Sequence, residues 1–134
     1  MRSTKIHKIE VPIYNQVVNV LITNNIKNAA LYFEANYPGI DMDNVEYVDA
    51  FMQRVNNKEK GVSKLYIAIL EDCTPGTLVH ECVHAAWDIL DYIGVGVTAD
   101  NDEALAYLTQ FLFDKTSVIK EKQLKIKTST TIKA

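Results

Sequence analysis

The sequence predicts a single α+β domain over residues 1–134, in which one mixed or antiparallel sheet is packed against helices. Two observations lead to this class. Strand-type runs occupy residues 5–23 and 45–70, and clear helix starts precede three other segments. The predicted order is therefore β-β-α-β-β-α-α. Hydrophobic residues make up 48% of the 134 residues, which is typical of one domain with one core.

The segment Lys5–Thr23 predicts a β-hairpin. Its two runs, IHKIEVPIY and QVVNVLIT, are rich in β-branched residues, and Asn15 lies at the break between them. Pro12 has no backbone N–H to donate. Its strand is therefore expected at a sheet edge, or the proline at a bulge.

A first helix is expected from Ile26 to about Asn36. Asn25 is a suitable capping residue, and Pro38-Gly39 ends the pattern. Apolar residues recur between these limits at helical spacing: Ala29, Ala30, Phe33 and Tyr37.

The segment Val45–Val55 fits two structures. Its helical pattern is Val45, Val48, Met52 and Val55, and its strand pattern is Val45, Tyr47, Phe51 and Val55. A polar break, Asn56–Gly61, and the apolar run Lys64–Leu70 follow. A hairpin accounts for all three pieces together, so a strand is predicted.

Two helices are expected in the second half of the chain. Thr74 is a capping residue and Pro75 suits the first helical position, so one helix should run to about Tyr92 and stop before Gly94. After a loop, Asn101 or Asp102 caps a last helix from Glu103 to about Lys115. The polar, threonine-rich tail of residues 120–134 is expected to be a loose strand or frayed.

Charge and composition narrow the possible partners. The net charge is −3, and the densest cationic run, Lys115–Lys133, is interrupted by Glu121, so nucleic acid is not an expected partner. No apolar stretch approaches the roughly 18 residues of a membrane span, and no signal core follows the basic N-terminus. Two cysteines, Cys73 and Cys82, do not make a disulfide framework. A protein that is cytoplasmic, or released without a cleaved signal, and that has no membrane partner is therefore expected.

The segment His80-Glu81-Cys82-Val83-His84 is an HExxH motif on a predicted helix. Residues four apart lie one turn above each other, so both imidazoles can reach one metal ion. Glu81 lies about 100° around the helix from His80. Its carboxylate would then lie beside a metal-bound water and could act as general base. Cys82 lies about 200° from His80 and is expected to face the core.

A catalytic zinc usually has three protein ligands and one open position. His7, in the first strand, is the only other histidine, and the longer HExxHxxGxxH pattern is absent because Trp87 stands where its glycine would be. A carboxylate is therefore expected as the third ligand. Glu103 is the best candidate, because it opens the next predicted helix after eighteen intervening residues.

This pattern resembles the gluzincins, the zinc peptidases that include thermolysin and related aminopeptidases. The resemblance covers about Leu65 to Leu112, and it looks like a minimal version, similar to small zincin-like proteins of bacteria and phages. It implies a zincin-like fold, one Zn²⁺ per chain, and hydrolysis of a peptide or protein substrate. It also implies that the apolar strand Lys64–Leu70 is the sheet edge along which substrate binds.

The resemblance assigns the ligand roles to His80, His84 and Glu103, and the general base to Glu81. The matching helix start is Asn101-Asp102-Glu103-Ala104, with one more acid than the family pattern, so Asp102 remains an alternative ligand.

Two further residues lie one helical turn from the motif residues. Tyr107 follows Glu103 by one turn and is a candidate to stabilise the oxyanion, or to support a ligand. Asp88 follows His84 by one turn and could orient a ligand. The alternative to a peptidase is a catalytically inactive zinc-binding protein that regulates or holds a partner.

Overall fold

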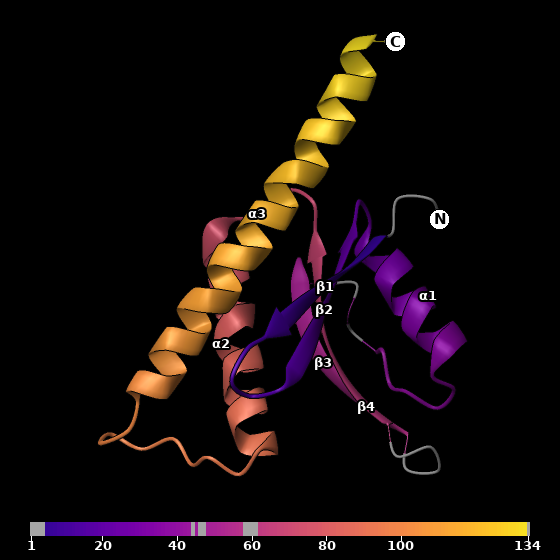
Figure 1. Ribbon diagram of the computed structural model, residues 1–134. Helices are drawn as coiled ribbons and strands as arrows, with labels where there is room; N and C mark the ends of the chain where they lie inside the picture. Colours follow the sequence, from indigo (N-terminus) through magenta and orange to yellow (C-terminus); the bar gives the residue numbers. More distant parts are fainter. Residues whose placement is uncertain (1–4, 44, 46–47, 58–61, 134) are drawn as a thin grey trace.

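The computed structural model describes residues 5–43, 45, 48–57 and 62–133, which form three layers (Figure 1). The strands are β1 (Lys5–Val11), β2 (Gln16–Thr23), β3 (Ala50–Asn57) and β4 (Val62–Leu70). The helices are α1 (Ile26–Asn36), α2 (Pro75–Tyr92) and α3 (Glu103–Lys133). Helix α1 covers one face of the sheet, and α2 and α3 cover the other. The predicted α+β class and element order are confirmed.

The four strands form one mixed sheet in the order β1-β2-β4-β3. Strands β1 and β2 are antiparallel, as are β3 and β4, so both predicted hairpins are confirmed. The central pair, β2 and β4, runs parallel, with Val20 opposite Ile67. Pro12 directly follows β1, which is an edge strand, as its missing N–H predicted.

Strand β4 is not an edge strand, so that part of the sequence-based prediction is wrong. It lies between β2 and β3 and hydrogen-bonds to both. Its residues Leu65 to Ile69 are at most 3% exposed, because both faces of β4 are covered. A run without polar alternation is typical of such a doubly buried strand. The free edge on the α2 side of the molecule belongs to β3 instead.

Strand β3 begins at Ala50, which confirms a strand over a helix for this segment. The predicted first part of the strand, Val45–Asp49, precedes it. Residues 44, 46 and 47, and residues 58–61 of the predicted polar break, lie outside the described residues.

The helix starts follow from local capping. The Asn25 side chain accepts a hydrogen bond from the backbone N–H of Lys27 at 3.0 Å. The Thr74 hydroxyl accepts one from the N–H of Thr77 at 3.1 Å, and Pro75 occupies the first turn of α2. Each cap satisfies an N–H that has no partner within its helix.

The main core lies between the sheet and the pair α2 and α3. Alternate residues of β2 and β4 face these helices, and all are at most 1% exposed: Val18, Val20, Ile22, Leu65, Ile67 and Ile69. Helix α2 meets them with residues at helical spacing: Leu78, Cys82, Ala85 and Ile89. This packing fixes which side of α2 points away from the core.

Helix α3 continues to Lys133, so the predicted end near Lys115 and the loose tail are wrong. No proline or glycine follows Gly96, and the segment from Lys120 to Lys127 is rich in straight-chain residues that favour helix. The C-terminal part of α3 extends past the end of the sheet (Figure 1). Within the described residues, no helix combines the length and apolar character needed to cross a membrane.

Candidate functional site

The two motif histidines converge on the exposed side of α2. His80 Nε2 and His84 Nε2 lie 3.2 Å apart, and the ring centroids are 4.8 Å apart. Both residues are exposed to solvent. The spacing of four residues places one ring a turn above the other, as expected for a shared ligand.

The distance between the two nitrogens suits zinc. With Zn–N bonds of about 2.0–2.1 Å, nitrogens 3.2 Å apart subtend an angle of about 100° at the ion, close to the tetrahedral value. In the absence of metal, the same distance allows a hydrogen bond between neutral rings in complementary tautomers. The spacing of the pair is thus the one that two ligands of a tetrahedral site would have.

Glu81 lies beside the histidines but is turned toward the sheet. It is 9% exposed, and its carboxylate accepts a backbone hydrogen bond from Met52 in β3. Burial raises the pKa of the Glu81 carboxyl, while His80, His84 and the Met52 bond oppose that rise. The raised pKa means that the fold favours the protonated, neutral form of this carboxyl more than water does.

A second contact joins α2 to the edge strand. Arg54 of β3 donates from Nε to Asp88 Oδ1 at 2.6 Å, and this ion pair is largely buried. Arg54 also donates from Nη1 to the Ser63 hydroxyl at 2.9 Å and lies 4.2 Å from the ring centre of Tyr92. Asp88 thus pairs with the edge strand, which is not the role that its place beside His84 suggested.

The side of α2 that faces the core is buried against α3. Cys82 is fully buried, with Sγ 3.7 Å from the Thr116 hydroxyl of α3, so its predicted orientation is confirmed. Burial raises the pKa of the Cys82 thiol to about 11, and it also raises the pKa of Cys73. Both cysteines are buried free thiols.

Glu103 is not brought to the histidines. Cys82 and Thr116 are in contact, and Thr116 is thirteen residues beyond Glu103, about 20 Å along α3. Glu103 is exposed at the start of that helix, and Asp102 directly precedes it. Among the described residues, no group of three or more His, Cys, Asp or Glu side chains could hold a metal ion.

Tyr107 lies on the other side of the domain. It is 68% exposed and lines an apolar pocket of about 180 Å³ between α3 and the turn that joins β1 to β2. Strand β1 is the edge opposite β3, which contacts Glu81. The structure therefore separates Tyr107 from the histidines.

Two groups that contribute to the site were not predicted from the sequence, the Met52 backbone N–H and the Arg54 side chain. The Met52 backbone group carries no side-chain signal, so no motif could have revealed it. Arg54 did leave a signal in the sequence, because it is the one charged residue of β3 and follows the apolar Ala50 and Met52 on the same face of the strand. A cation on a buried face requires an acidic partner, and Asp88 meets that requirement.

No protein-family model, no curated protein and no solved structure matches the chain.

Proposed function

We propose that this protein is a zinc-dependent peptidase in which His80 and His84 bind the metal and Glu81 is the general base. The observation that carries the proposal is the convergence of the two imidazole nitrogens, 3.2 Å apart, next to a buried carboxylate. A helix with two incidental surface histidines would not need a buried glutamate between them. Burial of an unneeded carboxylate is costly.

Zinc held by the histidines would lower the pKa of a bound water and polarise the substrate carbonyl. With zinc in place, Glu81 would take the proton of the attacking water and return it to the leaving amine. The Met52 bond orients the carboxylate, and burial raises its pKa, which is the direction that strengthens a carboxylate as a proton acceptor.

The substrate chain is proposed to bind along β3, in place of the strand β4 expected from the sequence. Among the described strands, β3 pairs only with β4, so its other edge is available for a further strand. Met52 and Arg54 tie this edge to α2 at Glu81 and Asp88. A peptide added to β3 would therefore pass beside the histidines.

Glu103 remains the proposed third ligand, with Asp102 as the alternative. Asp102 lies in the connection between α2 and α3 and Glu103 in the first turn of α3, so either would reach the histidines only if these segments rearrange. This connection, residues 93–102, contains no helix or strand. Metal binding and ordering of ligand-bearing segments are often coupled in this way.

The test is metal content by mass spectrometry, followed by cleavage of a broad peptide library. Wild type should hold about one zinc per chain, as one three-ligand catalytic site requires. His84→Ala and Glu103→Gln should lose zinc, Glu81→Gln should retain zinc but lose cleavage, and His7→Gln is the matched control. Loss of zinc in Asp102→Asn instead of Glu103→Gln would transfer the third-ligand role. A wild type that takes up no zinc would overturn the proposal.

The second candidate is a zinc-binding protein that holds a partner without cleaving it. An exposed apolar row beside the histidines favours it: Val79, Val83 and Trp87 lie on successive turns of α2 and are 38%, 39% and 51% exposed. Such rows are typical of contact surfaces. A wild type that binds zinc and cleaves no library peptide would support this candidate.

A further inference from the structure

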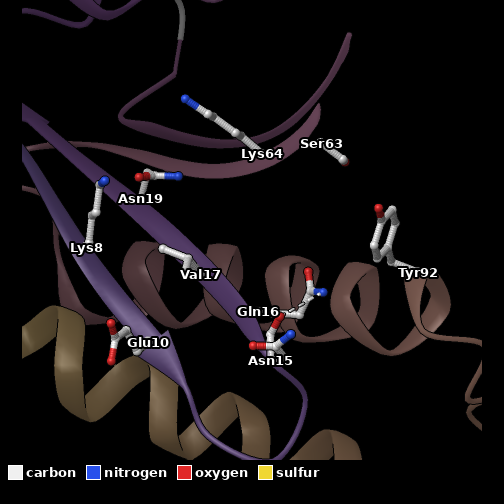
Figure 2. A pocket seen from close by; sticks show the side chains of 9 residues that line it. All are labelled: Lys8, Glu10, Asn15, Gln16, Val17, Asn19, Ser63, Lys64 and Tyr92. Carbon is white, nitrogen blue, oxygen red and sulfur yellow. Dashed lines mark hydrogen bonds between the residues drawn. The ribbon is translucent and has the colours of Figure 1, made fainter. Parts of the chain in front are cut away.

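A polar cavity of about 450 Å³ lies at the end of the sheet, away from the histidines (Figure 2). Lys8, Glu10, Val17, Asn19 and Lys64 lie on the sheet face that carries α1, whereas Tyr92 comes from the end of α2, which covers the other face. Nine residues line it: Lys8, Glu10, Asn15, Gln16, Val17, Asn19, Ser63, Lys64 and Tyr92. Its volume falls within the range of small-molecule sites.

One end of the cavity has the composition of an anion site. Asn19 of β2 is 7% exposed, and its amide nitrogen is fixed by a 3.2 Å hydrogen bond to the Leu65 carbonyl. Lys8 lies directly opposite Asn19 in the register of β1 and β2. Lys64 is on the same face of β4, two residues before Tyr66, the register partner of Asn19. Two lysines thus flank one buried amide.

Lys8 and Lys64 belong to a part of the sequence that contains many more acidic than basic residues. Residues 1–114 contain sixteen acidic and only eight basic side chains, yet two of the eight line this cavity with a single acid, Glu10. Figure 2 shows Lys8, Asn19 and the Lys64 amine at one end of the cavity. Two amines and a fixed amide suit a phosphate group, which carries more charge than a carboxylate.

The other end of the cavity offers an aromatic surface. The Tyr92 ring is there, at the end of α2 (Figure 2). Tyr92 is 53% exposed, and the Arg54 guanidinium packs on its ring at 4.2 Å, which holds the ring in place. A flat heterocycle could stack on the exposed ring surface. Glu10 could accept hydrogen bonds from sugar hydroxyls.

We propose that this cavity binds a nucleoside monophosphate, with the phosphate between Lys8 and Lys64 and the base against Tyr92. The site is separate from the proposed peptidase centre and needs no metal. It does share Tyr92 and Ser63 with the contacts of Arg54, which also pairs with Asp88. A ligand in the cavity would therefore be linked through Arg54 to Asp88, which lies on α2 one turn beyond His84.

The test is calorimetric titration of the full chain with AMP, at low salt and in EDTA so that no metal contributes. AMP should bind saturably and more tightly than adenosine or inorganic phosphate alone. Lys8→Ala and Lys64→Ala should each weaken AMP binding by about tenfold, as loss of one charge-assisted contact implies. Tyr92→Leu should reduce the advantage of AMP over phosphate.

The matched control is Lys125→Ala, which removes an exposed lysine on α3, outside the cavity. It should leave AMP binding unchanged. Circular dichroism of each variant checks that the fold is retained. The proposal is overturned if AMP does not saturate at millimolar concentration, or if both cavity lysine variants bind AMP as the control does.

Discussion

Arg54 and Asp88 form the side-chain ion pair that joins the edge strand to the motif helix, with Nε and Oδ1 2.6 Å apart. The two residues are 34 positions apart in sequence, and their side chains are 12% and 24% exposed. The pair lies one turn beyond His84 and two residues along β3 from Met52. It therefore links α2 to the β3 edge close to the candidate site.

Removing one partner of this pair should lower stability more than removing both. Arg54→Met or Asp88→Asn should reduce the free energy of unfolding by about 1–3 kcal/mol, because each leaves a largely buried charged or polar group without its partner. The measurement is urea denaturation, with Lys125→Met as the control. Additive effects in the double variant would contradict a direct coupling.

Glu81→Gln should stabilise the metal-free protein at neutral pH. Burial raises the pKa of Glu81 in the fold, so the stability associated with its protonated form is present below its unfolded pKa and lost as pH rises. A neutral glutamine avoids this loss and should gain about 0.5–2 kcal/mol. Thermal unfolding in EDTA checks the sign. A wild type more stable than the variant at pH 7 would contradict it.

His7 should make the protein less stable in mild acid. Burial, with a smaller effect from Lys5, lowers the pKa of His7 below its ordinary value of 6.5. The unfolded chain then binds the proton more readily, so stability is full above pH 6.5 and falls as the pH drops below it. Urea denaturation at several pH values should show a smaller loss in His7→Leu. Equal slopes in both proteins would rule out this contribution.

Neither cysteine should react quickly in the native protein. Cys73 and Cys82 are 4% and 0% exposed, and burial raises the pKa of both thiols, for Cys82 to about 11. The thiolate is the reactive form. A thiol reagent at pH 8 should label both cysteines in denaturant and neither within the same time in the fold. Rapid native labelling of Cys82 would show that α3 separates readily from α2.

The features predicted correctly were those encoded by neighbouring residues. The α2 start needed only Thr74 and Pro75, and the convergence of His80 and His84 needed only a spacing of four on a helix. The orientation of Cys82 followed from the same helical geometry. Local patterns of this kind do not depend on how the rest of the chain is packed.

The features predicted incorrectly depend on contacts between distant segments. Strand β4 was expected at an edge, but β2 pairs with its other side. The register of β2 with β4 joins residues more than 40 positions apart, which no local pattern specifies. The place of Glu103 depends likewise on how α3 packs on α2, and this packing aligns Cys82 with Thr116.

The length of α3 has a consequence for the motion of the molecule in solution. A compact domain of this size has a radius of gyration of roughly 14 Å, whereas the 31 residues of α3 extend about 46 Å. Tumbling should therefore be anisotropic, with the slow axis perpendicular to α3. The α3 amide vectors lie along the long axis, so their ¹⁵N relaxation should report a longer apparent correlation time than that of amides oriented across it.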